Sequence, residues 1–97
     1  MIFRREKALK DSSVVSRAEG ISSTESSEGV FLVDARGGRL YQLNPSGAAI
    51  WAGISTPIRV EELCRRVAAE FSVDSETIRP DVFALVSELY RVGLLHL

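Results

Sequence analysis

The stretch from Leu40 to Trp51 constrains the fold most, because a strand pattern ends there and a helix pattern begins without a linker. Residues 40–43 alternate in hydropathy, as a half-buried strand does. Asn44 can cap a helix with its side chain, and Pro45 has the φ angle that the first helical turn requires. The sequence therefore predicts that a strand converts directly into a helix at Pro45.

A β-hairpin is predicted just before this junction. Residues 30–33 are a compact run of β-branched and aromatic side chains, and Gly37 and Gly38 can adopt the positive φ angles of a turn before the chain resumes as a strand at Leu40. The free edge of such a hairpin would be the strand from Leu40 to Leu43.

The chain before the hairpin carries weaker signals. Residues 1–13 show no period and predict a loose start, and residues 14–19 predict a short strand. The polar, serine-rich tract 22–29 cannot bury apolar surface and predicts an exposed connecting loop.

Three helices are predicted after the junction. The first ends near Gly53, the second carries its apolar side chains at helical spacing, and the third begins after Asp74 and runs to Gly93. Pro80 predicts a kink or a separate turn before the main part of the third helix. The core is expected to contain Val60, Leu63, Cys64, Val67, Ala68 and Phe71 from the second helix, Val82, Leu85, Val86, Leu89 and Val92 from the third, and Trp51.

This order of elements predicts one α+β domain over residues 1–97, a winged-helix-like fold with a two- or three-stranded antiparallel sheet followed by three helices. A chain of 97 residues, 45% of them hydrophobic, has room for one modest core and little room for an enclosed active site.

The segment from Tyr41 to Trp51, read Tyr-Gln-Leu-Asn-Pro-Ser-Gly-Ala-Ala-Ile-Trp, closely resembles the signature of PqqD-like proteins, whose fold is called the RiPP recognition element. The resemblance continues through residues 60–63, 71–74, 81–86 and 93–95, and it implies the same order of strands and helices. Arg59 departs from the family pattern, which has a hydroxyl cap there, and Pro80 interrupts the approach to the last helix.

Composition excludes several kinds of chemistry. A single histidine, His96, cannot build a catalytic triad or a multi-histidine metal site, and the single cysteine, Cys64, excludes an internal disulfide. No phosphate-binding or dinucleotide-binding glycine pattern occurs. We therefore expect no enzyme activity, no metal and no cofactor. The absence of a secretory or membrane-spanning segment predicts a cytoplasmic protein.

A winged-helix order also raises the hypothesis of DNA binding through the last helix. That helix carries one basic residue, Arg91, beside the acidic Asp81 and Glu88, and the chain has a net charge of −1. Such a helix would bring little positive charge to a phosphate backbone. Nucleic acid and membrane surfaces are therefore not expected as partners.

Capture of a peptide as an added strand is the preferred hypothesis. A hairpin edge offers unpaired backbone groups to another chain, and members of the resembled family bind the leader segment of a ribosomally made precursor beside their third strand and against their last helix. By that resemblance, one wall of the site would be Arg39, Leu40, Tyr41, Gln42 and Leu43, and the other Val82, Phe83, Val86, Ser87 and Tyr90. Phe83 and Tyr90 fit the groove and the core equally well.

The resemblance is strongest to the stand-alone leader-binding proteins of lasso-peptide pathways, which serve a separate leader peptidase. An alternative is the peptide chaperone of pyrroloquinoline quinone biosynthesis, which presents its precursor to a radical SAM enzyme. The expected partners are thus a leader segment and a leader peptidase or other modifying enzyme. A monomer is expected, with a hairpin-swapped dimer possible if the serine-rich tract acts as a hinge.

Overall fold

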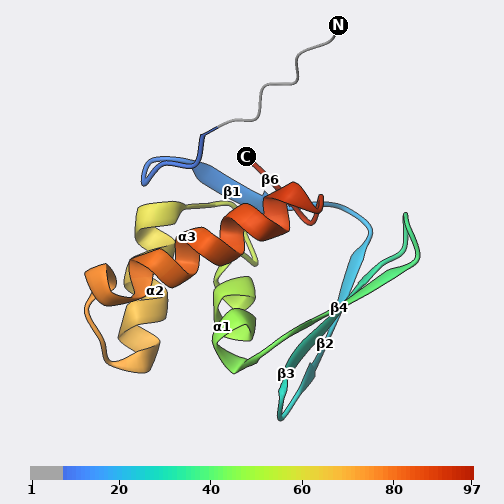
Figure 1. Ribbon diagram of the computed structural model, residues 1–97, viewed down its shortest axis with the longest axis horizontal. Helices are drawn as coiled ribbons and strands as arrows, with labels where there is room; N and C mark the ends of the chain where they lie inside the picture. Colours follow the sequence, from blue (N-terminus) through green and yellow to red (C-terminus); the bar gives the residue numbers. More distant parts are fainter. Residues whose placement is uncertain (1–7) are drawn as a thin grey trace, which may run out of the picture.

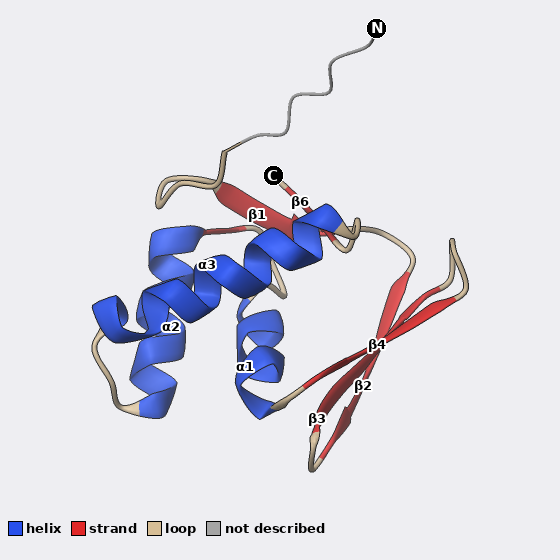
Figure 2. Cartoon of the chain, viewed as in Figure 1, coloured by secondary structure: helices blue, strands red, loops and turns tan. Residues whose placement is uncertain are grey.

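The structure, a computed structural model, describes residues 8–97 (Figure 1). These residues form two small antiparallel sheets and three helices. Figure 2 shows how the strands and helices are arranged. One sheet has the order β5-β1-β6 and consists of β1 (Val14–Arg17), β5 (Ile58–Arg59) and β6 (Leu95–His96). The other has the order β2-β3-β4 and consists of β2 (Ile21–Ser26), β3 (Gly29–Asp34) and β4 (Arg39–Leu43). The predicted α+β class is confirmed.

The helices are α1 (Pro45–Gly53), α2 (Val60–Phe71) and α3 (Ser75–Arg91). Helix α3 lies across α2, while α1 stands between the helices and the sheet of β2, β3 and β4 (Figure 1). One core joins all of them, and its fully buried side chains are Val15, Leu32, Ile54, Val60, Leu63, Val67, Val82, Val86, Leu94 and Leu95. The hairpin sheet contributes to this core through its inner face only.

The predicted junction between strand and helix is confirmed. Asn44 is extended, with φ −68° and ψ 175°, and the oxygen of its side chain accepts a hydrogen bond of 2.8 Å from the backbone N–H of Gly47. Pro45 begins α1, where its missing N–H costs nothing. Since no residue separates the two elements except this cap, β4 and the start of α1 hold a fixed relative orientation.

The serine-rich tract is a strand, so the predicted loop over residues 22–29 is wrong. Strand β2 pairs with β3 in register from Ile21 opposite Asp34 to Ser26 opposite Gly29, and only residues 27 and 28 form the turn. The side chains of β2 remain almost entirely exposed. Backbone hydrogen bonds to β3 are enough to order this edge strand, because β3 supplies the apolar side chains that the sheet buries.

Helix α3 continues through Pro80, so the separate turn predicted there is absent. Proline removes the hydrogen bond to the carbonyl of Glu76. Both residues are exposed, which allows water to satisfy the freed carbonyl group.

A loose start is predicted for residues 1–13, of which residues 1–7 lie outside the described part of the chain and residues 8–13 contact the helices. Leu9 packs against the core. The carboxylate of Asp11 forms an ion pair of 2.9 Å with Arg79 on α3. The segment is therefore attached to the last helix.

This segment also replaces the hydroxyl cap that the sequence lacks before α2. Arg59 makes no side-chain capping bond. Instead, the backbone N–H groups of Val60 and Glu61 each donate a 2.9 Å hydrogen bond, to the carbonyl oxygens of Ser13 and Asp11 respectively. Two of the helix's unpaired donors are thereby satisfied by backbone from a distant segment.

Three expectations about the core need correction. Phe71 is 41% exposed at the end of α2, and Leu85 and Val92 are only partly buried. Trp51, Leu63 and Leu89 are buried as predicted. Among residues 8–97 no helix is long and apolar enough to cross a membrane.

Candidate functional site

Strand β4 lies at one edge of its sheet and pairs only with β3. The two-residue turn at residues 27 and 28 closes on Ser26 and Gly29, which form a hydrogen-bonded pair. Bonded and non-bonded pairs alternate from there, so Val30 and Leu32 direct their backbone groups away from β2 and toward β4.

The same alternation identifies the unpaired groups of β4. Leu43, Tyr41 and Arg39 lie opposite Val30, Leu32 and Asp34 and use their N–H and C=O groups to hold β3. Leu40 and Gln42 direct theirs outward. The free edge of β4 therefore offers two N–H donors and two C=O acceptors to an incoming strand.

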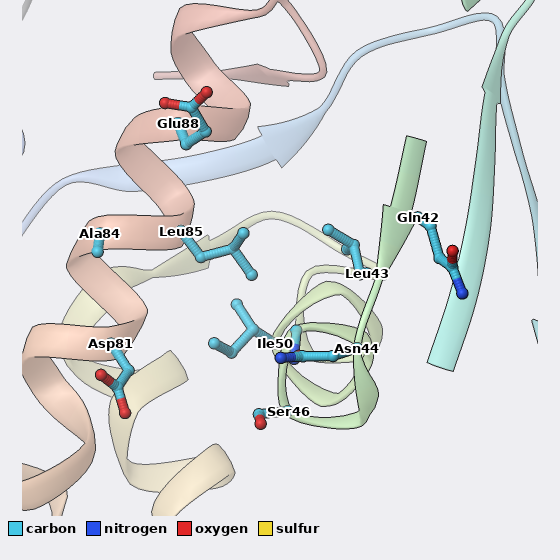
Figure 3. Close-up of a pocket in the computed structure, with 10 residues that line it drawn as sticks. Gln42, Leu43, Asn44, Ser46, Ile50, Asp81, Ala84, Leu85 and Glu88 are labelled. Carbon is cyan, nitrogen blue, oxygen red and sulfur yellow. The ribbon is translucent and has the colours of Figure 1, made fainter. Parts of the chain in front are cut away.

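A groove of about 690 Å³ runs between β4, the start of α1 and one face of α3 (Figure 3). Its lining comes from these three elements and comprises Gln42, Leu43, Asn44, Ser46, Gly47, Ile50, Asp81, Ala84, Leu85 and Glu88. A groove of this size beside a free strand edge has the shape that strand addition requires.

The middle of the groove is apolar. Leu43, Ile50 and Leu85 point toward one another from β4, α1 and α3 (Figure 3). Gly47 lets Leu43 and Leu85 approach α1 closely, because a Cβ atom there would lie 3.1 Å from the Cβ of Leu43 and 3.4 Å from the Cδ2 of Leu85. An apolar side chain of a bound peptide would find its contacts here.

The charges that line the groove are all negative. Asp81 and Glu88 lie two helical turns apart on α3, on either side of the apolar middle (Figure 3). Glu88 forms an ion pair with Arg91 on the same helix. Asp81 makes no hydrogen bond or ion pair to any of residues 8–97.

Arg36 connects the loop after β3 to the end of α3. Its guanidinium group binds the carboxylate of Asp34 at 2.9 Å and donates a 2.8 Å hydrogen bond to the carbonyl oxygen of Gly93. The hydrogen bond from Arg36 lowers the pKa of the Asp34 carboxyl group. This contact fixes the far end of β4 relative to α3, and so helps to set the spacing of the groove walls.

The five residues predicted on the strand all lie on β4. Gln42 and Leu43 line the groove. Leu40 is 65% exposed and Arg39 is exposed, whereas Tyr41 is partly buried against the core. The five predicted strand residues therefore lie side by side on β4, but their side chains point to two opposite faces of the sheet.

The five residues predicted on α3 do not line the groove. Val82 and Val86 have no exposed surface, so they cannot form its wall in this conformation. Phe83 is half buried, and the Cζ atom of Arg79 lies 4.2 Å above the centroid of the Phe83 ring. Ser87 and Tyr90 line a smaller cavity of about 220 Å³ that includes Leu9 and Leu97.

The groove face of α3 is a neighbouring face of the helix, formed by Asp81, Ala84, Leu85 and Glu88. Ile78, Val82, Val86 and Leu89 face the core. The spacing of three or four residues between Asp81, Ala84, Leu85 and Glu88 places them on one helical face, but only Ala84 and Leu85 are apolar, so no apolar stripe singled out this face in the sequence. Its role depended on where α3 sits relative to α1.

Cys64 is 3% exposed, and burial raises the pKa of its thiol. The neutral thiol is therefore the dominant form near neutral pH, which suits a packing role. Residues 8–97 contain no cluster of three histidine, cysteine, aspartate or glutamate side chains able to hold a metal ion.

Comparison with solved structures gives the same fold in complexes with peptides. The structure of TbiB1 in complex with the TbiA(beta) leader peptide matches with 26% identity and a TM-score of 0.74, covering 84% of this chain and 94% of that one. A lasso peptide synthetase B1 complexed with its leader peptide matches with 24% identity and a TM-score of 0.71, covering 86% and 98%.

A third match is the solution structure of the PqqD part of Methylobacterium extorquens PqqCD, described as a functional and stand-alone RiPP recognition element. It has 15% identity and a TM-score of 0.77, with 93% of this chain and 96% of that one covered. No curated protein matches the sequence. The family model of coenzyme PQQ synthesis protein D matches residues 29–95, more than half of the chain. The resemblance seen in the sequence is confirmed, and the chain belongs to the PqqD family.

Proposed function

We propose that this chain binds the leader segment of a ribosomally synthesised precursor peptide as an extra strand beside β4, and delivers the precursor to a separate enzyme. The observation that carries the proposal is the free edge of β4 along an apolar groove. The similarity to TbiB1, which was solved with a leader peptide, supports it.

Backbone pairing with β4 and apolar burial in the groove would both contribute to the affinity for a leader. Four backbone hydrogen bonds at Leu40 and Gln42 contribute about 2–6 kcal/mol in total, at 0.5–1.5 kcal/mol each. Micromolar binding requires about 8 kcal/mol. Burial of apolar surface over Leu43 and Leu85 adds to the hydrogen bonds at about 25 cal/mol per Å². Neither the strand nor the apolar groove is sufficient alone, because association also costs entropy.

The protein would supply proximity and no chemistry of its own. A leader held in the groove keeps the rest of the precursor within reach of the enzyme, at an effective concentration of about millimolar for a short flexible link. The resemblance of the segment from Tyr41 to Gly47 favours a lasso-peptide pathway, with a leader peptidase as the enzyme. Presentation to a radical SAM enzyme in pyrroloquinoline quinone biosynthesis is the alternative.

Amide hydrogen exchange measured by NMR tests the proposal residue by residue, with the leader of the precursor encoded beside this chain as the probe. In the free protein the amides of Tyr41 and Leu43 should exchange slowly, since they bond to β3, while those of Leu40 and Gln42 should exchange fast. Saturating leader should slow exchange at Leu40 and Gln42 specifically.

A short DNA duplex, about as long as the leader peptide, serves as the control ligand. Protection of Leu40 and Gln42 by the leader, with no effect of DNA, supports strand addition. Leader binding that leaves both amides unprotected would show that the peptide does not pair with β4. A response to DNA alone would favour the winged-helix hypothesis.

A further inference from the structure

The charged side chains along the groove can select the sequence of a bound peptide, which backbone pairing cannot do. Backbone hydrogen bonds accept any sequence, so selectivity must come from side chains along the walls. Asp81 and Glu88 are the only formally charged residues among those that line the groove, and both are acidic. An acidic side chain of a guest would meet repulsion wherever such a carboxylate has no cation beside it.

The two carboxylates are not equivalent. Glu88 binds Arg91, three residues further along α3, so a cation already compensates its charge. Asp81 has no cationic partner among residues 8–97, and it stands at the end of the groove near Ser46 and the start of α1 (Figure 3). An uncompensated charge at one end only makes the groove electrostatically asymmetric.

We propose that Asp81 selects a lysine or arginine side chain in the bound peptide, next to an apolar residue seated over Leu43, Ile50 and Leu85. This inference rests on the proposed function and names its substrate class: a leader segment with a basic residue at one fixed distance from an apolar one. Because only one end of the groove carries an unpaired charge, the contact also fixes the register and direction of the added strand.

The spacing follows from the geometry of the two elements. From Leu85 to Asp81 is four residues of helix, or about 6 Å along α3. Side chains on one face of an extended strand repeat every two residues, about 6.6 Å. If the guest strand runs along α3, the basic residue therefore lies two positions from the apolar residue that contacts Leu85.

Panning a phage-displayed library of random twelve-residue peptides tests this inference whatever the sequence of the natural leader. Peptides enriched on the unchanged protein should carry lysine or arginine two positions from an apolar residue. On the variant Asp81→Lys, acidic residues should replace them at that position. The matched variant Glu88→Lys changes a charge in the same groove, and should leave the position near Asp81 basic.

Affinities of one enriched peptide give the size of the effect. Asp81→Asn should weaken binding about fivefold at physiological salt, whereas Glu76→Gln, which removes an exposed charge of α3 outside the groove, should leave the affinity unchanged. The difference should shrink in 1 M salt, because the charges are then screened over about 3 Å.

Two failures are distinguishable in the same experiment by amide exchange. Enriched peptides that protect Leu40 and Gln42 but show no basic preference, or the same preference on Asp81→Lys, overturn the role of Asp81 and leave strand addition standing. If no enriched peptide protects those amides, the proposed function fails, and the inference fails with it.

Discussion

Proline substitution on β4 separates the strand's role in binding from its role in folding. Gln42 directs its N–H group to the free edge, whereas Tyr41 directs its own toward Leu32 on β3. Proline lacks this donor and is tolerated at edge positions whose N–H faces outward. Gln42→Pro should therefore remove one bond to the leader and none to the fold, while Tyr41→Pro should do the reverse.

The expected magnitudes differ accordingly. Loss of one of four backbone bonds, together with the ring's bulk at the edge, should weaken leader binding at least tenfold, about 1.4 kcal/mol. Stability of Gln42→Pro should change by less than about 1 kcal/mol. Tyr41→Pro leaves the carbonyl of the fully buried Leu32 without its donor, which costs about 1–3 kcal/mol.

Isothermal titration calorimetry measures the affinity, and urea unfolding followed by Trp51 fluorescence measures stability. A folded Gln42→Pro protein that binds the leader as tightly as the unchanged protein would refute pairing along β4. Equal destabilisation by the two prolines would instead refute the assigned alternation of hydrogen bonds on this strand.

Four further outcomes are expected. Asn44→Ala removes the cap of α1 and should lower the free energy of unfolding by about 0.5–2 kcal/mol in urea, with Asn44→Asp retaining most of it. Gly29→Ala places a Cβ atom onto the carbonyl oxygen of Leu43 at a φ of +128°, so its urea midpoint should fall well below that of any other variant here; an unchanged midpoint would contradict the described turn. The hydrogen bond from Arg36 holds the pKa of Asp34 below its ordinary 3.8, so the pair stabilises the fold above pH 4 and loses its contribution as the pH falls through the lowered pKa. Between pH 7 and pH 3, the free energy of unfolding in urea should therefore decrease less for Asp34→Asn than for the unchanged protein. Cys64 should react slowly with a thiol reagent at pH 7.5 in the folded protein and quickly in urea, and rapid modification of the native state would mean that the thiol is accessible.

Local signals in the sequence determined the elements around the groove. Asn44 and Pro45 specify where β4 becomes α1, because the cap and the fixed φ act within one turn of chain. The hairpin of β3 and β4 and the apolar stripe of α2 follow equally from short-range periodicity. The family signature from Tyr41 to Trp51 covers the same junction, and its implied fold is the one observed.

Strand β2 shows where such signals fail. Its serine-rich sequence has no apolar alternation, so nothing local distinguishes it from a loop. Its order comes from backbone pairing with β3, an interaction that depends on the partner strand and not on the side chains of β2. The contacts of the segment before β1 have no local signal for the same reason, because they depend on backbone hydrogen bonds to a distant part of the chain. Its carbonyl groups cap α2 from almost 50 residues away.

The sequence by itself determined that a free strand edge would exist and that α3 would carry a buried stripe. Only the tertiary structure decided which face of α3 meets that edge. A helix with apolar residues on two adjacent faces can rotate either one into the core, and packing against α2 and β6 directs Val82 and Val86 inward. Leu85 and Asp81 are thereby left facing β4, because about 100° of helix rotation separates Leu85 from Val86.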